Sequence, residues 1–287
     1  IRDRYYRICT ADTPSQNIVL LLAPLYKPTE DDKNKIVEKY NLSFEYNPID
    51  VGVRVEVPNE VFNEIVEEYC IWDPKFHIRT ESYDDFVRTF CTNPSGFVVK
   101  ESYGNSLIGI NGHSMKNKKS PNTNFAFLVR VRLTHPLENT TLYGKRIVQL
   151  INTLGGGKPL IQRLGDLKKH RRSTWERINR SYIEPTLKDV TPGDIAMAYP
   201  ERIVTDIIEG LSSLDKVVPG VFADSTLLYA PEIKFYAIRP VTDKKLKSVD
   251  IPNLFFAGDG AGVSRGIVGA AATGIIAAKG ILEEVGI

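Results

Sequence analysis

The sequence predicts a mixed α/β protein, of the α+β kind, with one β-rich lobe that also carries helices and a second, smaller lobe. Two observations lead to this fold class. Residues 51–57 alternate valine with other residues, which is the period of a β-strand, and short apolar runs separated by turn residues follow. Further along, apolar residues recur at three- and four-residue spacing, which predicts helices. At 287 residues, 42% of them hydrophobic, the chain is long enough to bury a substantial core.

The first 49 residues form the least regular part of the sequence. Residues 18–23 are apolar and predict a short buried strand. A break follows at 24–29, which contains two prolines, and residues 30–40 are a candidate polar helix. We assign residues 1–49 to a partial lobe, which residues 246–287 complete.

Residues 50–245 predict the β-rich lobe. The alternation from Val51 to Val57 predicts a strand with one buried face, and Pro58-Asn59 ends it before a helix. Turn residues at 93–96 and 103–105 separate the strands of a meander. We expect these strands at 76–79, 86–91, 96–100, 106–110 and 125–133.

The second half of this lobe predicts helices. Residues 147–154 carry apolar side chains at helical spacing, and the triple glycine at 155–157 is typical of a helix C-terminus. Ser173 and Glu176 have the spacing of a capping box, so we expect a helix to begin at Ser173. A third helix is predicted from 200 to 214, and strands are expected at 227–229 and 233–238.

The C-terminal segment is the most informative part of the sequence. Residues 254–257 are apolar and predict a strand buried on both faces. Three glycines at 258, 260 and 262 follow, and because they lack a Cβ they permit a ligand to approach the main chain closely. From about Gly266, small and apolar residues predict a helix packed tightly on a sheet, whose free N-terminal amides favour negative charge.

The run Phe256-Ala-Gly-Asp-Gly-Ala-Gly262 resembles the second FAD-contact motif of the glutathione-reductase-like flavoproteins. In that motif the aspartate binds the ribityl chain, and the following helix points at the pyrimidine ring of the flavin. The resemblance implies a partial, nucleotide-type lobe of the FAD-binding Rossmann type, formed by residues 1–49 and 246–287. It assigns the cofactor contacts to Gly258, Asp259, Gly260, Ala261, Gly262, Arg265, Gly266, Ile267 and Val268.

More of the chain, from about Asn47 to the end, resembles the uncharacterised family of FAD-dependent or NAD(FAD)-utilising dehydrogenases. The resembling segments are Pro48 to Pro58, Tyr83 to Pro94, Asn111 to Ser114, Gln162 to Asp166 and Arg172 to Arg177. The resemblance implies FAD as the cofactor, NAD(P)H as a candidate electron donor and a small-molecule substrate of unknown identity. It also implies that residues 50–245 form the substrate-type lobe.

One departure from that family concerns the adenylate half of the cofactor site. Its members carry a strand followed by G-x-G-x-x-G near the N-terminus to hold the FAD pyrophosphate, and these 287 residues contain no such spacing. The triple glycine at 155–157 does not replace it, because Leu160 stands where the third glycine is needed. We therefore expect a chain that is truncated, rearranged or incompletely recorded at its N-terminus.

The sequence leaves the catalytic residues unassigned, because hydride chemistry on a flavin needs little from side chains beyond positioning and proton transfer. Arg265 fits a contact with flavin or pyrophosphate as well as it fits a salt-bridged loop position. His113 lies in a polar turn and is a candidate acid or base, although we favour an ordinary loop histidine. Cys91 is a candidate redox thiol, although we favour a packing role.

One concentrated basic run is the candidate for contact with RNA or an anionic substrate. It spans residues 168–172, Lys-Lys-His-Arg-Arg, and Trp175 and Arg177 follow it. We favour a solvated loop and do not expect nucleic acid as a partner, because the net charge of the whole chain is only +2.

Composition excludes several other classes of site. The three cysteines at 9, 70 and 91 provide neither a CxxC pair nor a disulfide framework, so we expect a reducing cytoplasm. The four histidines share no ligand spacing, so we propose no metal site. No apolar run reaches the roughly 20 residues that cross a membrane, so we expect no membrane partner. The sequence does not indicate an oligomeric state.

Three functions follow from these observations. The first is an FAD-dependent oxidoreductase of unknown substrate, with the flavin held by the C-terminal turn and helix. The second is a structural or interaction fragment of such a flavoprotein that no longer binds FAD tightly. The third is a flavin-assisted tRNA-modifying protein, which would use the basic run.

Overall fold

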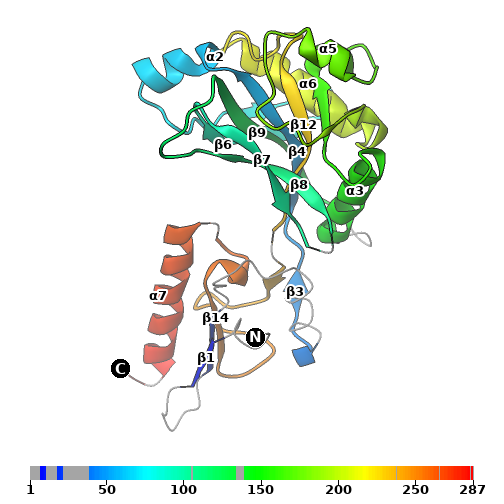
Figure 1. The fold of residues 1–287 in the computed structure, drawn as a ribbon. Coiled ribbons are helices and arrows are strands. Elements are labelled where there is room, and N and C mark those ends of the chain that lie inside the picture. The colour runs from blue at the N-terminus through cyan, green and yellow to red at the C-terminus, as the bar shows by residue number, and fades with distance from the viewer. Residues whose placement is uncertain are drawn as a thin grey trace. The chain divides into compact units, whose positions relative to one another are not determined.

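The computed structural model describes residues 7–10, 18–21, 39–104, 106–133, 139–236, 238–264, 266–284 and 286. The chain divides into two compact units, and each is described by itself (Figure 1). Unit 1 comprises Ile1–Pro48, Thr134–Thr141 and Tyr236–Ile287. Unit 2 comprises Ile49–Leu133 and Leu142–Phe235. The predicted helix at 30–40 lies almost wholly outside the described residues.

Unit 2 is built on one large sheet with the strand order β11-β10-β12-β4-β9-β6-β5. Its central strands β4 (Ile49–Pro58) and β9 (Asn122–Val131) pair antiparallel along their full lengths, from Ile49 opposite Val131 to Pro58 opposite Asn122. The remaining strands are β5 (His77–Arg79), β6 (Phe86–Asn93), β10 (Leu160–Arg163), β11 (Thr191–Pro192) and β12 (Leu227–Lys234). β10 and β11 run parallel, so the sheet is mixed. The predicted mixed α/β fold class is therefore confirmed.

The main core of unit 2 lies on one face of this sheet. The valines of β4 and the aromatic residues of β9 pack there against apolar side chains of α3 (Thr140–Leu154) and α6 (Glu201–Asp215). Gly210 lets α6 approach closely, because a Cβ at this position would lie 2.8 Å from the Phe127 ring. The predicted helices at 147–154 and 200–214 thus exist, because each carries the apolar face that this sheet needs.

A second layer covers part of the other face of the sheet. β7 (Phe97–Ser102) and β8 (Ile108–His113) form an antiparallel hairpin, and β8 contacts β12, β4, β6 and β9 (Figure 1). The prediction that residues 51–57 form a strand with only one buried face is therefore wrong. Arg54 and Glu56 point away from the valines and are nevertheless fully buried.

The ends of the helices and strands differ from the sequence expectation in two further places. α5 (Trp175–Asn179) is capped by Thr174, whose side chain accepts a hydrogen bond from the Arg177 N–H, so the predicted cap at Ser173 is one residue early. The strand predicted at 227–229 and the first two residues of the strand predicted at 233–238 form a single strand, β12, which ends at Lys234 and has a register shift between Tyr229 and Glu232. Pro231 lies at this irregularity, where its missing N–H cannot contribute to the ladder.

The triple glycine ends α3 as predicted. The Gly157 N–H donates to the carbonyl of Asn152 at 2.7 Å, and Gly156 and Gly157 have φ angles of +63° and +86°. Reversal of the chain in the left-handed region after a helix is the role that glycine fills best. The remaining helical segments are α2 (Glu60–Asn63), the π-helical turn η2 (Glu64–Glu68), α4 (Leu164–Leu167) and the 3₁₀ turn η3 (Ile195–Met197).

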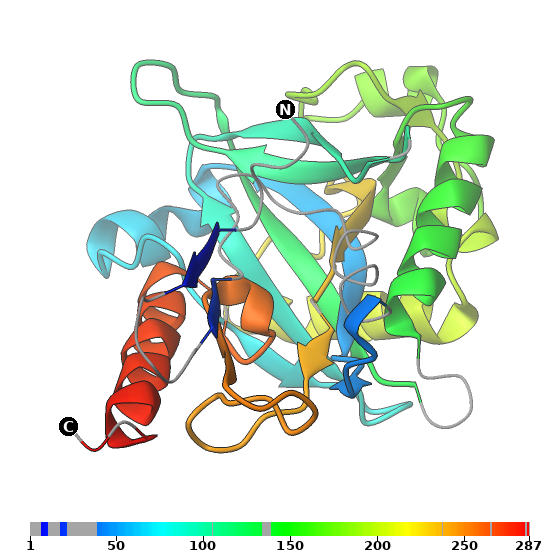
Figure 2. The same ribbon diagram turned by 90° about the horizontal axis from the view of Figure 1, so that it is seen from below.

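Unit 1 contains a short sheet with the strand order β1-β2-β14. β14 (Leu254–Ala257) runs parallel to β2 (Ile18–Leu21), and β1 (Arg7–Thr10) pairs antiparallel with β2. The strands predicted at 18–23 and 254–257 are therefore confirmed. α7 (Ile267–Glu284) contacts β14, as Figure 2 shows, and a small ladder joins β3 (Phe44–Glu45) to β13 (Arg239–Pro240).

Candidate functional site

The glycine-rich turn of unit 1 connects β14 to α7. Gly258 has a φ of 91°, a backbone angle that residues with a side chain rarely adopt. Its N–H donates to the Thr273 hydroxyl at 2.7 Å. The segment from Asp259 to Ala261, η4, is a single 3₁₀ turn that Gly262 closes at a φ of 72°. A Cβ on Gly262 would lie 2.8 Å from the carbonyl oxygen of Ile238. The glycines therefore fix the path of the chain from the strand to the helix.

Asp259 is the exposed carboxylate of this turn. Its Oδ1 accepts a hydrogen bond of 3.2 Å from the Gly266 N–H, so the side chain ties the turn to the start of α7. No other donor among the described residues contacts this carboxylate. Its exposed second oxygen can therefore accept a hydrogen bond from a hydroxyl group of a ligand.

The side chains of α7 differ strongly in burial. The helix packs on β14 through small residues, Thr273, Ala277 and Gly280, which are buried. At its first turn, the side chains of Ile267 and Val268 are 90% and 84% exposed. Large aliphatic residues left this open at a helix N-terminus are a feature that a covering ligand or chain would account for.

The structure brings most of the predicted contact residues into one continuous strand, turn and helix. The residues so placed are Gly258, Asp259, Gly260, Ala261, Gly262, Gly266, Ile267 and Val268. Arg265, the remaining candidate, lies outside the described residues. Their assignment as contacts of a cofactor stays a prediction.

The other candidates from the sequence belong to unit 2. His113 ends β8 and is exposed. Cys91 lies at a β-bulge of β6 with a φ of 49°, and its thiol is a free cysteine of intermediate exposure. Its carbonyl oxygen accepts a hydrogen bond of 2.8 Å from Nη1 of Arg54, so the bulge turns this carbonyl toward the interior. The bulge thus gives the main-chain carbonyl of Cys91 a part in the hydrogen bonding of Arg54.

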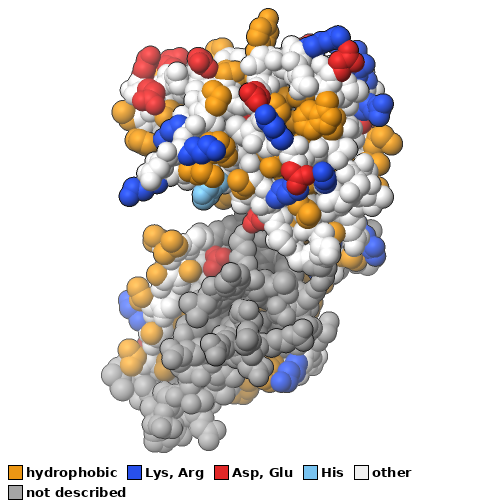
Figure 3. Space-filling model, viewed as in Figure 1, with side chains coloured by type: hydrophobic (Ala, Val, Ile, Leu, Met, Phe, Trp, Pro, Cys, Tyr) orange, Lys and Arg blue, Asp and Glu red, His pale blue; other side chains and the backbone are white. Residues whose placement is uncertain are grey.

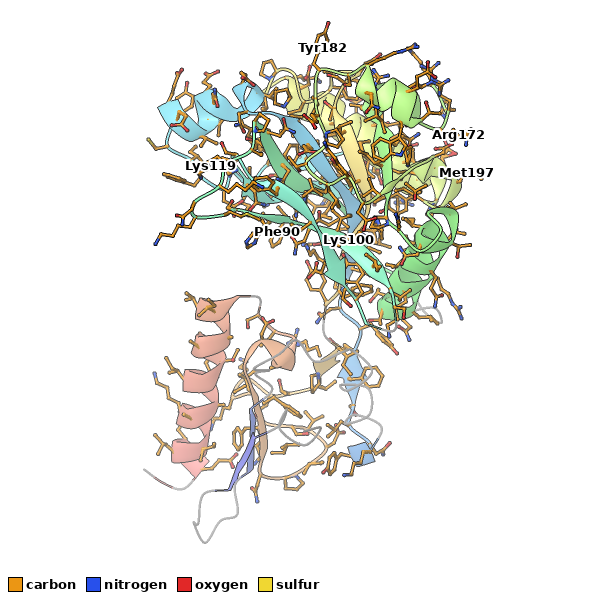
Figure 4. All side chains as sticks on the ribbon, viewed as in Figure 1. Phe90, Lys100, Lys119, Arg172, Tyr182 and Met197 are labelled. Carbon is orange, nitrogen blue, oxygen red and sulfur yellow. The ribbon has the colours of Figure 1, made fainter. Side chains whose placement is uncertain are left out.

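The basic run at 168–172 is largely paired with acidic side chains. Lys168 and Lys169 lie 2.5 and 3.7 Å from the Asp224 carboxylate, and Arg171 donates to the buried Asp166 at 2.8 Å. The other oxygen of Asp166 accepts from the Ser173 hydroxyl, which ties the run to the start of α5. Arg172 is exposed and projects from the surface in Figure 4. The run is therefore a loop held by ion pairs and hydrogen bonds, and most of its cations already have acidic partners.

Sequence reasoning missed a buried polar centre between the two layers of unit 2. Arg54 is fully buried, and its Nε and Nη2 each donate at 2.6 Å to one oxygen of the equally buried Glu232. Nη1 also reaches the side chain of Asn124, and Nη2 reaches that of Asn111 at 3.1 Å. The guanidinium of Arg54 thus pairs with the carboxylate in a bidentate manner and also donates to further acceptors. A buried charge requires such partners.

Gly112 explains why the hairpin can lie directly over this centre. A Cβ at this position would be 2.4 Å from the Asn124 amide oxygen and 2.6 Å from Nη1 of Arg54. Such distances are shorter than any ordinary van der Waals contact, so a side chain here would displace the network. The glycine within the motif Asn111-Gly-His-Ser114 is therefore needed for packing of the second layer.

A second buried carboxylate, Glu56, lies on the same face of β4. It accepts hydrogen bonds from the Tyr229 hydroxyl, the Asn122 amide and Thr186. Removal from water raises the pKa of Glu56, and these donors oppose the rise. The phenol of Tyr229 is fully buried, and its pKa is raised well above the usual value by burial and by Glu56. Both side chains are fully buried and hydrogen-bonded to each other, so they join β4 to β12 in the interior of unit 2.

Two further classes of site find no support in the described part of the chain. No group of three or more His, Cys, Asp or Glu side chains there has an arrangement that could hold a metal ion. No helix of the described ranges is both long and apolar enough to cross a membrane.

Two protein-family models match parts of the chain. The model of the family described as FAD-dependent protein, C-terminal domain-like, matches residues 48–234, which coincide closely with unit 2. The model of glucose inhibited division protein A matches residues 189–285, which include the end of unit 2, the glycine-rich turn and the whole of α7.

A curated protein matches most of the chain. The chain is 28% identical over 273 residues to an uncharacterized protein of Clostridium beijerinckii, and the match covers 88% of this chain and 50% of that protein. The chain thus spans about half the length of this relative. Because the first family model covers well over half of the 287 residues, this chain belongs to the family of FAD-dependent proteins that is defined by this C-terminal domain.

Proposed function

We propose that this chain forms part of an FAD-dependent oxidoreductase and that the turn between β14 and α7 holds the flavin and ribityl portion of the cofactor. The observation that supports this most strongly is the combination at one end of α7 of an exposed carboxylate, Asp259, with two exposed aliphatic side chains, Ile267 and Val268. A flavin offers hydroxyl groups and a flat apolar ring, which match these two features.

The residues present fit such a cofactor in their chemistry. Asp259 accepts hydrogen bonds from ribityl hydroxyls, and the glycines at 258 and 262 fix the turn that carries this carboxylate. Ile267 and Val268 cover the ring and exclude water. The first N–H groups of α7 favour negative charge in front of them. The bound flavin supplies the hydride chemistry, with NAD(P)H proposed as the electron donor and a small molecule as the substrate.

A titration of the full chain with FAD tests the proposal. Asp259→Ala removes a charged acceptor and should weaken FAD binding roughly tenfold to a hundredfold, whereas Asp259→Asn keeps an acceptor and should do less harm. Asp243→Ala is the matched control, because this exposed aspartate of unit 1 also accepts backbone hydrogen bonds, from Lys245 and Lys247. Equal affinity of the wild type and Asp259→Ala would refute the ribityl assignment.

The same titration separates the proposal from its two alternatives. A protein that cannot be reconstituted with FAD, and so lacks flavin absorbance at about 450 nm, would support a structural fragment without tight cofactor binding. Flavin-assisted tRNA modification has less support, because Asp224 and Asp166 already pair with three cations of the basic run. It would be favoured only if replacing Lys168, Lys169, Arg171 and Arg172 together lowered RNA affinity and its salt dependence.

A further inference from the structure

The turn that follows α2 and η2 in unit 2 carries a run of large apolar side chains that remain exposed. Tyr69, Ile71 and Trp72 are 64%, 48% and 73% exposed. Exposed hydrophobic residues that are scattered singly are ordinary on a protein surface, whereas a contiguous group of them marks a site of interaction. Exposed tyrosine and tryptophan side chains are also typical of the centre of a protein–protein interface.

The backbone holds this run in a defined conformation. The Tyr69 N–H donates to the Glu64 carbonyl, and the Ile71 N–H donates to the Ile65 carbonyl, each at 3.0 Å. Cys70, between them, has a φ of 55°, so the chain reverses there in the left-handed region that ends many helices. The apolar side chains therefore project from an ordered turn, and less conformational entropy is lost when a partner binds them.

The same segment is acidic. Residues 60–74 contain no lysine or arginine, and their acidic residues are Glu60, Glu64, Glu67, Glu68 and Asp73. Asp73 pairs with Lys75 at 2.6 Å, whereas the glutamates are exposed and form no ion pair with any described residue. Figure 3 shows acidic side chains beside hydrophobic ones at the end of unit 2 that carries α2. We call this surface the Glu64–Trp72 ridge, and it consists of Glu64, Glu67, Glu68, Tyr69, Ile71 and Trp72.

The loop between β8 and β9 has the complementary charge. Residues 114–119 read Ser-Met-Lys-Asn-Lys-Lys, and each of them is exposed. Lys116, Lys118 and Lys119 have no ion pair in the described part of the chain, and the Lys118 ammonium lies 5.2 Å from the centroid of the Phe97 ring. Met115 is 38% exposed and adds apolar surface. We call residues 114–119 the basic loop.

The ridge and the basic loop start from the same point of unit 2. Asn59 stands directly before α2, and its N–H donates to the Pro121 carbonyl at 3.0 Å. The side-chain amide of Asn59 donates to the Ser120 carbonyl, also at 3.0 Å. Figure 4 labels Lys119 on the side of unit 2 that carries α2. The two surfaces thus lie on one side of unit 2, and across the described ranges no ion pair joins them within the chain.

We propose that a second copy of this chain covers the Glu64–Trp72 ridge and that the basic loop of that copy is the segment that binds there. Because both surfaces lie on one side of unit 2, a two-fold axis between the copies forms this contact twice, as a symmetric dimer requires. The glutamates pair with lysines, while Tyr69 and Trp72 pack on Met115 and on the apolar stems of the lysines. This inference does not rest on flavin binding, because all of its residues belong to unit 2.

Analytical ultracentrifugation of the full chain over a range of protein and salt concentrations tests the proposal. We expect an equilibrium between monomer and dimer that shifts toward the monomer as the salt concentration rises. A chain that stays monomeric up to about 100 μM at low salt would overturn the proposal. Octalysine, a basic peptide, is the probe for another occupant. A monomeric chain that binds octalysine at the ridge would assign this surface to a basic partner of a different kind, which also overturns the proposal.

Charge reversal identifies the two surfaces. The variants Glu67→Lys/Glu68→Lys and Lys116→Glu/Lys119→Glu should each weaken dimerisation on the order of a hundredfold, because each places like charges opposite one another twice in a symmetric dimer. The four changes together should restore most of the affinity, because the same attraction returns with its signs exchanged. If each pair of changes weakens the dimer and their combination does not restore it, the ridge and the basic loop are not partners.

Two further variants separate the interface from effects on the fold and on net charge. Trp72→Ser should weaken dimerisation about tenfold or more. The thermal unfolding of the monomer, measured at high salt, should change little in this variant, because the side chain is 73% exposed. Glu201→Lys is the matched control, since this exposed glutamate of α6 belongs to neither surface, and it should leave dimerisation unchanged. A dimer that is insensitive to Trp72→Ser, or equally sensitive to Glu201→Lys, would refute the ridge as its interface.

Discussion

The two units differ in whether their most notable charged groups are buried or exposed. In unit 2, Arg54 and Glu232 are fully buried and satisfy each other, so their chemistry is used within the fold. In unit 1, Asp259 and the aliphatic side chains at the start of α7 are exposed and have few protein partners. The difference teaches that residue type alone does not mark a site. A charged residue is available for function only where the fold leaves part of it uncovered.

Breaking the buried pair is the change with the largest expected effect on this comparison. Arg54→Met leaves Glu232 as a buried carboxylate whose one remaining cation, among the described residues, is Lys234 at 3.1 Å. We expect a loss of about 3–5 kcal/mol in the free energy of unfolding, measured by urea denaturation. The double variant Arg54→Met/Glu232→Leu should recover much of this loss, because no unpaired charge remains. A single variant as stable as the wild type would show that the pair is not needed for the fold.

Two glycines, Gly112 in unit 2 and Gly274 in unit 1, differ in the room available for an added methyl group. Gly112→Ala forces a methyl group into the Arg54 network and should lower the free energy of unfolding by about 2–3 kcal/mol. Gly274→Ala places a methyl group on α7 where nothing lies within 4 Å, and should stabilise that helix by about 0.5–1 kcal/mol. Thermal unfolding of the two variants measures both effects. Loss of stability in Gly274→Ala would indicate that α7 is covered.

Two neighbouring carboxyl groups of unit 2, those of Asp206 and Asp85, should make the free energy of unfolding depend on pH. Asp206 of α6 is fully buried, and burial, with the nearby Asp85, raises its pKa to about 6, while Thr80 donates to its Oδ1. Among the described residues, its Oδ2 has no hydrogen-bond partner, so a proton there would donate to Asp85. Arg202 pairs with Asp85 and holds the pKa of that carboxyl below its usual value.

The sign of the effect follows from the direction of the Asp206 shift. The folded state binds the proton more tightly than the unfolded state, so stability from this group is fully present below about pH 4 and is lost as the pH rises through about 6. The rise in pKa from 3.8 to about 6 corresponds to a loss on the order of 3 kcal/mol. Asp206→Asn mimics the protonated form and should flatten this part of the curve of unfolding free energy against pH. An unchanged slope in this variant would assign the dependence to other groups.

Local sequence patterns were sufficient to predict part of this structure. The turn residues at 93–96 and 103–105 separate real strands, and the glycines at 155–157 end α3, because turn chemistry depends on adjacent residues. The strand, turn and helix from 254 onward could be predicted for the same reason. The predicted strand ends differ from the observed ends by a few residues, because pairing with neighbouring strands determines where a strand stops.

The buried centre of unit 2 could not be predicted from the sequence in the same way. Arg54 and Glu232 lie 178 positions apart, and only the fold brings them together. The alternation of β4 has the same appearance whether its polar face meets water or a second layer of strands. The position of Cys91 at a bulge likewise depends on the register with β9, which no local pattern specifies.

The smallest expected effect on stability belongs to the residues that we place against the flavin. Ile267→Ser/Val268→Ser changes side chains that are 90% and 84% exposed, so the free energy of unfolding of the cofactor-free protein should change by less than about 0.5 kcal/mol. Ile281→Ser, on the same helix but packed against the cluster of Phe255 and Ala257, should cost about 1–2 kcal/mol. FAD affinity should respond in the reverse order, with a several-fold loss only in the Ile267/Val268 variant. If the affinity is equal in the two variants, these side chains do not cover the flavin, and their exposure in unit 1 requires another explanation.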